Sequence, residues 1–407
     1  MANKPKIRFK GFDDAWEQRK LGELAEIVGG GTPSTSMGSY WDGDIDWYAP
    51  AEIGEQIYLE SSQRKITEKG LNKSSAKILP IGTVLFTSRA GIGKTAILLK
   101  EGCTNQGFQS IVPNKEKLDS YFIFTRSEEL KRYGETVGAG STFVEVSGKQ
   151  MADMELMMPK TTLEQQQIGE YFSKLDHLIT LHQRKCDQMK ELKKYMLTKM
   201  FPQNGAKVPE IRFDGFTDDW EQRKLGEIAE FSKGSGYSKG DLVEYGTPII
   251  LYGRLYTNYE TCISDVDTFV EAKVGSVYSK GGEVIVPASG ETAEDIARAA
   301  TVDKSGILLG GDLNIVMPNK DINSSFLAIS ISSGNPQREL AKKAQGKSVV
   351  HIHNEEIKNL VLPFPIKDEQ NKIASYFCQL DHLITLHQSK CENLKNLKKY
   401  MLRNMFV

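Results

Sequence analysis

The chain has no surplus of either charge, because its 52 lysine and arginine residues are matched by 53 aspartate and glutamate residues. A small nucleic-acid-binding domain usually carries a clear excess of lysine and arginine. The total charge therefore gives no support to nucleic-acid binding. It leaves the distribution of charge open, since a basic face can form where acidic residues gather elsewhere, for instance at a surface that meets a partner.

Long hydrophobic runs are missing as well. No stretch of about 18 apolar residues occurs, and residues 1–6 lack the apolar segment of a secretion signal, so we expect a cytoplasmic protein. The cysteines include no C-x-x-C pair, which argues against a zinc ribbon and against a disulfide framework. We expect all five to be reduced packing residues: Cys103, Cys186, Cys262, Cys378 and Cys391.

Signatures of catalysis are also absent. We find no G-x-S-x-G elbow, no H-E-x-x-H helix, no dinucleotide-binding glycine motif after a strand and no Asn-Pro-Pro-aromatic segment. Residues 88–95 resemble a Walker A loop but begin with serine where glycine is required. His351 and His353 would share one face of a strand without a third ligand. We therefore predict no catalytic residue, no metal site and no cofactor in this chain.

What the chain does contain is an internal repeat. Residues 16–23 return letter for letter as residues 220–227, and residues 175–183 return as residues 380–388. The shift between the copies stays at 204 or 205 positions. Two copies kept in nearly constant register predict a protein with pseudo-twofold symmetry, which suits a two-part target.

Each copy begins with a globule. Short apolar and β-branched runs between turn residues, such as residues 82–87 and 282–287, are typical of strands. The fold class that we predict is α+β, with two α/β globules separated by two long helices that pair as an antiparallel coiled coil. The predicted boundaries are 1–160 for the first globule, 161–203 for the first helix, 204–365 for the second globule and 366–407 for the second helix.

The two helices carry apolar residues at a spacing of three and four, which is the heptad pattern of a coiled coil. About 38 helical residues predict a rod of about 55 Å. Each apolar stripe needs a partner, so we expect the helices to pair, with His182 against His387 and with the chain termini close together. The alternative is that each helix packs on its own globule. The predicted seam consists of Ile168, Phe172, Leu175, Ile179, His182, Cys186 and Met189, and of Ile373, Phe377, Leu380, Ile384, His387, Cys391 and Leu394.

This arrangement of variable globules and repeated helices resembles the specificity (S) subunit of type I restriction-modification enzymes along the whole chain. The resemblance is carried by the repeated segment that begins at Trp16 and Trp220, by Gly-x-Thr-Pro-Ser at residues 30–34, and by residues 87–93 and 105–108. The helix entries at residues 164–168 and 369–373 carry it too. The second globule departs from the pattern because it lacks Gly-x-Thr-Pro-Ser and Arg-Ala-x-Ile-Gly.

The resemblance implies that each globule is a target-recognition domain that reads one half of a split double-stranded DNA site, while the helices set the gap. It implies a non-catalytic subunit that docks two methyltransferase (M) subunits. The M subunits would carry S-adenosylmethionine and methylate adenine, and restriction (R) subunits would add cleavage with ATP and magnesium. A symmetric scaffold that binds proteins or glycans and a self-sufficient nuclease or methyltransferase are the alternatives.

Loop and strand-end residues of the types that reach phosphates or base edges are the candidate DNA contacts. In the first globule these are Thr32, Tyr40, Arg89, Lys94 and Gln106. In the second they are Lys233, Tyr237, Arg254, Tyr256 and Asn258. For docking of M subunits we predict Trp16, Trp220, Leu175, Leu178, Leu380 and Leu383, although the tryptophans also suit a hydrophobic core.

Overall fold

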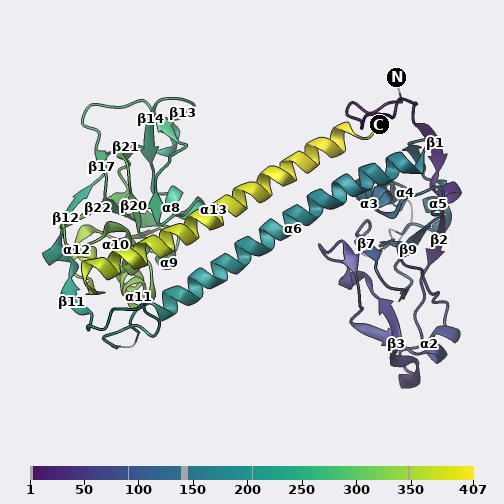
Figure 1. Cartoon of the computed structure of the whole chain (residues 1–407), viewed down its shortest axis with the longest axis horizontal. Helices are drawn as coiled ribbons and strands as arrows, with labels where there is room; N and C mark the ends of the chain where they lie inside the picture. Colours follow the sequence, from purple (N-terminus) through teal and green to yellow (C-terminus); the bar gives the residue numbers. More distant parts are fainter. Residues whose placement is uncertain (1–2, 90, 139–144, 204, 347–348) are drawn as a thin grey trace. The chain divides into compact units, whose positions relative to one another are not determined.

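The computed structural model describes residues 3–89, 91–138, 145–203, 205–346 and 349–407 (Figure 1). The chain divides into two compact units. Unit 1 comprises Met1–Leu181 and Cys391–Val407, and unit 2 comprises His182–Lys390. Each unit therefore holds one globule together with a part of each long helix. Within the described residues, no helix combines the length and the apolar character needed to cross a membrane.

A five-stranded sheet forms the centre of the globule in unit 1. Its innermost strands are short β-branched and apolar runs whose side chains are buried, as expected for a sheet covered on both faces. The edge pair β7/β4 is parallel and the other pairs are antiparallel. In sheet order the strands are β2 (Ala25–Gly29), β9 (Gln109–Pro113), β6 (Val84–Phe86), β7 (Thr95–Leu98) and β4 (Tyr58–Leu59).

Smaller elements complete the unit 1 globule. A second sheet has the order β5 (Arg64–Ile66), β3 (Trp41–Tyr48) and β8 (Cys103–Thr104), and β1 (Glu17–Lys20) pairs with β10 (Glu155–Met158). The short helices are α1 (Leu21–Leu24), η1 (Gly38–Tyr40), η2 (Pro50–Glu52), α2 (Glu68–Asn72), α3 (Ser120–Thr125), α4 (Ser127–Gly138) and α5 (Gly148–Asp153).

The central sheet of unit 2 repeats this topology. Its order is β12 (Ala229–Lys233), β22 (Leu313–Pro318), β18 (Glu283–Pro287), β20 (Ala300–Val302) and β15 (Cys262–Ile263). The edge pair β20/β15 is again parallel and the other pairs are antiparallel. The two globules therefore share one central-sheet topology, as the predicted pseudo-twofold repeat requires.

The remaining elements of unit 2 surround this sheet. A second sheet has the order β13 (Leu242–Val243), β16 (Phe269–Val270), β14 (Thr247–Ile250), β21 (Ser305–Leu309) and β17 (Tyr278–Lys280). β11 (Glu221–Lys224) pairs with β24 (Val361–Phe364), and β19 (Ser289–Gly290) pairs with β23 (Val350–His351). The short helices are α7 (Leu225–Ile228), η3 (Lys239–Asp241), α8 (Arg254–Thr257), α9 (Ala293–Ile296), α10 (Ser324–Ile331), α11 (Gly334–Lys343) and α12 (Asn354–Lys358).

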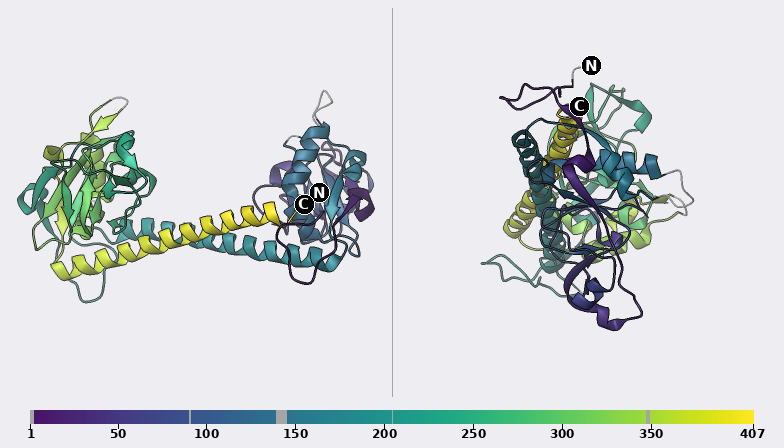
Figure 2. Two further views of the ribbon diagram at one scale, coloured as in Figure 1. Left: turned by 90° about the horizontal axis from the view of Figure 1, so that it is seen from above. Right: turned by 90° about the vertical axis from the view of Figure 1, so that its right-hand side faces the viewer.

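The long helices α6 (Thr162–Lys199) and α13 (Lys367–Asn404) have 38 residues each. In unit 1, Lys398 Nζ lies 2.6 Å from Asp176 Oδ1, and Cys391 Sγ lies 3.9 Å from the carbonyl oxygen of Ile179. As the residue number increases along α6, the number of the contacting residue on α13 decreases. The two segments therefore run antiparallel and side by side (Figure 2).

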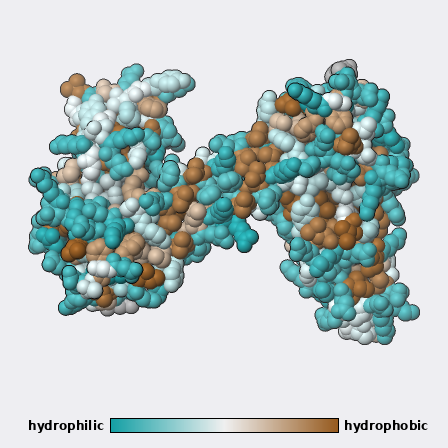
Figure 3. Space-filling view, in the orientation of Figure 1, coloured by the Kyte–Doolittle hydropathy of each residue, from teal (hydrophilic) through white to brown (hydrophobic). Residues whose placement is uncertain are grey.

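Unit 2 shows the same pairing. Lys193 Nζ lies 2.5 Å from Asp381 Oδ1, and the Nδ1 atoms of His182 and His387 lie 2.8 Å apart. The predicted antiparallel pairing and the predicted histidine contact are confirmed. The predicted seam is buried or partly buried throughout, whereas other leucines and tyrosines of the same helices are exposed. Figure 3 shows hydrophobic side chains at the surface of the helices.

The start of each repeat is anchored to the following long helix. Arg8 Nε lies 2.7 Å from Glu164 Oε1 at the start of α6, and Arg212 Nε lies 2.7 Å from Glu369 Oε1 at the start of α13. Both glutamates are almost completely buried. Their charge is therefore compensated by the arginine that comes from the lead segment of the same repeat.

The chain ends meet in unit 1. The backbone N–H of Ile7 donates a hydrogen bond of 2.9 Å to the carbonyl oxygen of Asn404, at the end of α13. In unit 2 the equivalent N–H of Ile211 donates a 2.9 Å bond to Lys199, at the end of α6. The bond from Ile211 links two parts of an uninterrupted stretch of chain, whereas the bond from Ile7 links the N-terminal and C-terminal segments. The expectation that the termini lie close together is confirmed.

One cysteine pair differs from the expectation that all five are reduced. The sulfur atoms of Cys262 and Cys378 lie 1.98 Å apart, which is a disulfide between β15 and α13. Cys103, Cys186 and Cys391 are buried thiols, as a packing role requires. No local pattern indicates this pair, because 116 positions separate its members and only the tertiary fold brings β15 against α13.

Candidate nucleic-acid interface

Two of the predicted DNA contacts in unit 1 lie side by side. The hydroxyl of Thr32, just beyond β2, donates a hydrogen bond to the side-chain oxygen of Gln106, in the turn between β8 and β9. The segments approach closely because residue 30 is glycine: a Cβ atom at Gly30 would lie 1.9 Å from the carbonyl oxygen of Asn105. Gln106 is exposed and Thr32 is partly exposed, so a polar pair from two segments faces solvent.

Two tryptophans hold residues 31–34, the segment that contains Thr32. The indole N–H of Trp47 donates a 2.8 Å hydrogen bond to the carbonyl oxygen of Gly31, and that of Trp41 donates a 3.1 Å bond to Ser34. The exposed guanidinium of Arg64 lies 3.7 Å from the centre of the Trp41 ring. Arg64 is thus a candidate phosphate contact that the sequence prediction missed. The available signal was an arginine in the next polar segments after the tryptophan-rich residues 41–48.

Arg89 and Lys94 lie in the tight loop between β6 and β7. The hydroxyl of Thr87 donates to the carbonyl oxygen of Gly91 over 2.7 Å and accepts the N–H of Lys94 over 2.9 Å. Gly91 and Gly93 adopt φ angles of +101° and +95°, which glycine takes without a steric penalty. Lys94 is exposed, so the loop holds a cation at the surface; Ala90 lies outside the described residues.

This loop does not have the architecture of a nucleotide-binding P-loop. A P-loop connects a strand to the N-terminus of a helix, whose N–H groups hold the phosphates. Here residue 95 begins β7, so the chain continues as a strand. Arg89 lies 3.8 Å from Glu145, and both side chains are more than one-third exposed, which makes this a weak surface pair. Arg89 is therefore able to exchange Glu145 for another anion.

Tyr40 belongs to η1, beside the second sheet of unit 1. Its carbonyl oxygen accepts a 3.0 Å hydrogen bond from the N–H of Thr67, and the ammonium of Lys69 lies 5.9 Å from the centre of its ring. The side chain is partly exposed. It directly precedes Trp41, whose indole N–H binds the carbonyl oxygen of Ser34.

In unit 2 the predicted contacts divide into two groups. Lys233, at the end of β12, and Asn258, after α8, are exposed. The hydroxyl of Tyr237 is instead used internally, because it accepts the N–H of Lys273 over 2.7 Å and lies 2.5 Å from Ser276 Oγ. Tyr256 donates a 2.5 Å hydrogen bond to the carbonyl oxygen of Ser289, and burial raises the pKa of its phenol. These two tyrosines support the fold of the globule.

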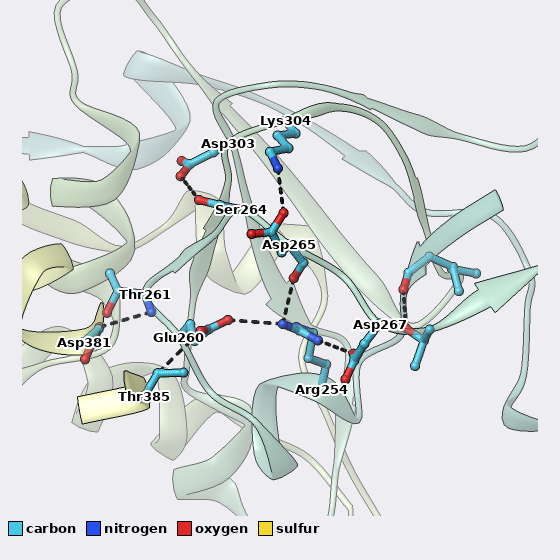
Figure 4. A network of polar contacts seen from close by, with 12 residues as sticks. Arg254, Glu260, Thr261, Ser264, Asp265, Asp267, Asp303, Lys304, Asp381 and Thr385 are labelled. Carbon is cyan, nitrogen blue, oxygen red and sulfur yellow. Dashed lines mark hydrogen bonds and ion pairs between the residues drawn. The ribbon is translucent and has the colours of Figure 1, made fainter. Parts of the chain in front are cut away.

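Arg254 is held by carboxylates rather than presented to solvent (Figure 4). Its guanidinium lies 2.8 Å from Asp267 Oδ1 and 3.1 Å from Glu260 Oε2, and it donates a further bond of 2.9 Å to the carbonyl oxygen of Asp265. The side chain is 11% exposed. A guanidinium that already has two carboxylate partners gains little from a phosphate, so Arg254 is better explained as a structural residue than as a DNA contact.

The residues predicted for docking also divide. Trp16 and Trp220 are 2% and 3% exposed, and Leu175 and Leu380 are 6% and 7% exposed in the helix seam, so none of the four has a side chain free to meet a partner. Leu178 and Leu383 are exposed, and further exposed residues extend the same stripe. This apolar stripe consists of Leu178, Leu181, Leu397 and Tyr400 in unit 1, and of Leu192, Tyr195, Leu383 and Leu386 in unit 2.

Comparison with known families identifies the repeat. A family model described as the type I restriction modification DNA specificity domain matches residues 13–191 and again residues 217–396. The chain belongs to this family. Its two matched regions each combine one globule with most of one long helix, so one specificity domain corresponds to one repeat.

Curated members of the family are similar to the chain at low to moderate identity. The type I restriction enzyme MjaIX specificity subunit of Methanocaldococcus jannaschii is 32% identical over 229 residues, which is 54% of this chain and 53% of the relative. That match thus spans about half the length of the relative. The MjaVIII specificity subunit of the same organism is 21% identical over 403 residues, covering 95% of this chain and 91% of the relative.

A solved structure shows the same fold. The crystal structure of the type I restriction-modification system S subunit from M. genitalium covers 99% of each chain with a TM-score of 0.67. Because the identity is 14%, this likeness concerns the fold alone. Together with the family match, it confirms the predicted fold class and membership of the specificity family.

Proposed function

We propose that this chain is the DNA-specificity subunit of a type I restriction-modification complex and that each globule reads one half of a bipartite site in double-stranded DNA. The observation that carries the proposal is the repetition of one topology with different surface residues. Thr32 and Gln106 face solvent in unit 1, whereas Lys233 and Asn258 do so in unit 2. Different half-sites require different base-edge contacts on a common scaffold.

The length of the helices supports this proposal. Half-sites one helical turn apart are separated by roughly 34 Å along DNA, and 38 helical residues extend about 55 Å. A coiled coil of fixed length would hold the two readers at one spacing, so that the complex accepts one spacer and rejects others.

The partners that we propose are two M subunits, one for each repeat, and R subunits in the complete complex. The apolar stripe supports M docking because it recurs in equivalent positions of both units and would be covered by a protein. The M subunits would supply S-adenosylmethionine and adenine methylation, and the R subunits would supply ATP- and magnesium-dependent cleavage. This chain would direct both reactions without catalysing either.

The test is to co-express this chain with the M subunit encoded beside it, purify the complex and map adenine methylation on genomic DNA by single-molecule sequencing. We expect methylation of one split motif. Exchange of residues 1–160 for the first globule of another specificity subunit should change one half of the motif and leave the other half and the spacer unchanged.

A contrary result would be equally clear. A stable complex with M that neither methylates DNA nor distinguishes DNA sequences would eliminate the reader function and favour a protein scaffold. Methylation by this chain purified without M would contradict the assignment of a non-catalytic subunit.

A further inference from the structure

Each unit contains a basic groove between a long helix and a helix of its globule. In unit 1 the groove has a volume of about 780 Å³ and is lined by Lys395, Lys398, Lys399 and Arg403 of α13 and by Arg132 of α4. In unit 2 the groove has a volume of about 570 Å³ and is lined by Lys190, Lys193 and Lys194 of α6 and by Arg338 of α11. The three lysines are equivalent positions of the internal repeat, so the two grooves are copies of one feature.

Internal ion pairs account for only part of this positive charge. In unit 1, Lys398 is paired with Asp176 over 2.6 Å, while Lys395, Lys399 and Arg403 make no ion pair within the described residues. Glu129 is paired with Arg126, so the anionic groups left in the described lining are the side chain of Glu128 and the chain-terminal carboxylate of Val407, against four unpaired cations once Arg132 is included. The unit 1 groove therefore keeps a surplus of cations.

The unit 2 groove keeps a surplus as well. Its single acidic residue among the described lining residues, Asp381, is paired with Lys193 over 2.5 Å. Lys190, Lys194 and Arg338 then remain without a carboxylate partner in the described part of the chain. Both grooves thus present uncompensated cations around one satisfied lysine–aspartate pair, which suits a polyanionic ligand.

The lysines lie on a different helix face from the apolar stripe. Successive residues of an α-helix are rotated by about 100°, so Leu192 lies about 160° away from Lys190 and from Lys194. Leu397 has the same relation to Lys395 and Lys399. A protein that docks on the apolar stripe consequently leaves the lysines uncovered.

The basic groove also adjoins the recognition surface. In unit 1, Gly93 is packed so closely on α4 that a Cβ atom there would lie 2.3 Å from the side chain of Lys131. Lys94, a predicted DNA contact, follows Gly93, and Arg132, which lines the groove, follows Lys131. Helix α4 therefore connects the loop that carries Lys94 to the groove.

From these observations we infer that the two basic grooves bind the phosphate backbone of DNA, independently of its sequence, while the globule loops read the bases. This inference rests on the proposed function and assigns it a pair of anchoring sites. The ligand must be the same in both units because the lysines are the same, and it must be anionic because the cations are uncompensated. The DNA backbone meets both conditions and lies beside any base that the globules read.

The test uses the complex of the full chain with its M subunits and fluorescence anisotropy of labelled duplexes over a range of potassium chloride concentrations. One variant combines Lys395→Gln with Lys399→Gln, and a second combines Lys190→Gln with Lys194→Gln. Each lost phosphate contact should reduce the slope of log K against log salt by about 0.9 and weaken binding about fivefold at 0.15 M salt. Each double variant should therefore bind about 30-fold more weakly, to cognate and unrelated duplexes alike.

The matched control combines Lys185→Gln with Lys390→Gln, which removes the same charge from exposed positions on the apolar side of the helices. It should leave the salt slope unchanged. Mass photometry should be used to check that each variant assembles, and thermal melting to check that it folds. An unchanged salt slope in the groove variants would overturn the inference. So would a groove variant that loses its M subunits while the complexes that still form bind DNA with the affinity of the natural protein. Binding to unrelated duplexes tests the grooves even if the natural complex methylates no motif. Failure of the proposed function and failure of this inference are therefore distinguishable.

Discussion

The Nδ1 atoms of His182 and His387 lie 2.8 Å apart, at equivalent positions of the two long helices in unit 2. A hydrogen bond at this distance requires one ring to donate and the other to accept, so at least one ring must be neutral. Partial burial and the neighbouring His387 lower the pKa of His182 below its usual value, with Lys185 and Lys390 adding to the effect. The contact therefore depends on deprotonation.

This relationship predicts that the protein loses stability as the pH falls through the usual histidine range. In the unfolded chain His182 takes up a proton near pH 6.5, whereas in the folded chain it does so only at lower pH, so its contribution to stability is present above about pH 6.5 and declines below it. The thermal midpoint followed by circular dichroism from pH 8 to pH 5 measures the effect. A variant with both His182→Gln and His387→Gln should show a flatter decline.

The control for this prediction is the pair His177→Gln with His382→Gln. These histidines are also equivalent positions on the two helices, but both are exposed. Their removal should leave the pH dependence as it is in the natural protein. An equal flattening by both pairs of substitutions would show that the contact between His182 and His387 is not the cause.

The buried ion pair of unit 2 predicts a large effect on stability. Arg212→Ala would leave Glu369, whose side chain is 0% exposed, without its cation, which costs about 3 to 5 kcal/mol. Urea unfolding should show this loss as a lower midpoint. Replacing both residues with methionine should recover much of it. Lys207→Ala breaks a pair whose side chains are 76% and 61% exposed, so its effect should stay below about 1 kcal/mol.

The features that sequence predicted well are those with a periodic or repeated signal. The spacing of Phe172, Leu175 and Ile179 defines one helix face, and a face of this kind needs an apolar partner. Because the same spacing returns around Phe377, the repeat itself supplied that partner. The match between the globules likewise followed from repeated segments at constant shift, even where the loops diverge.

The features that sequence predicted poorly depend on which residues meet in three dimensions. Arg254 has the right type for a phosphate contact, yet its partners Glu260 and Asp267 reach it only because the chain folds back after α8. An apolar side chain such as Trp16 is expected both at a partner interface and in a hydrophobic core, and the structure places it in the core. Neither outcome has a local pattern from which it could be read.

The apolar stripe predicts a separable defect in assembly. Leu178→Asn together with Leu383→Asn changes two exposed residues, 39% and 38% exposed, and so should barely alter the folding of this chain. Association with M subunits should weaken by about 10-fold or more, since central apolar contacts carry most interface energy. Size-exclusion chromatography and sedimentation measure it. Thr180→Asn, at an exposed position on a different face of α6, is the control; equal weakening by both would refute the stripe as the docking surface.

The close approach at Gly30 predicts a defect confined to one half-site. In Gly30→Ala the new Cβ would lie 1.9 Å from the carbonyl oxygen of Asn105, so the segments that carry Thr32 and Gln106 must move apart. Loss of correctly placed base contacts costs about 1 to 3 kcal/mol per contact. Methylation mapping should therefore show relaxed sequence requirements in the half of the motif that the first globule reads, with the other half intact.

The second globule provides the reciprocal experiment. A Cβ at Gly234 would lie 1.9 Å from the carbonyl oxygen of Gly310, so Gly234→Ala should relax the other half of the motif. Gly38→Ala and Gly236→Ala serve as controls in the first and second globules, because an added Cβ meets no atom within 4 Å at either position. If either glycine variant relaxed both halves equally, the two globules could not be independent readers. If the controls had the same effect as the variants, the steric explanation would fail, because each control makes the same chemical change without the clash.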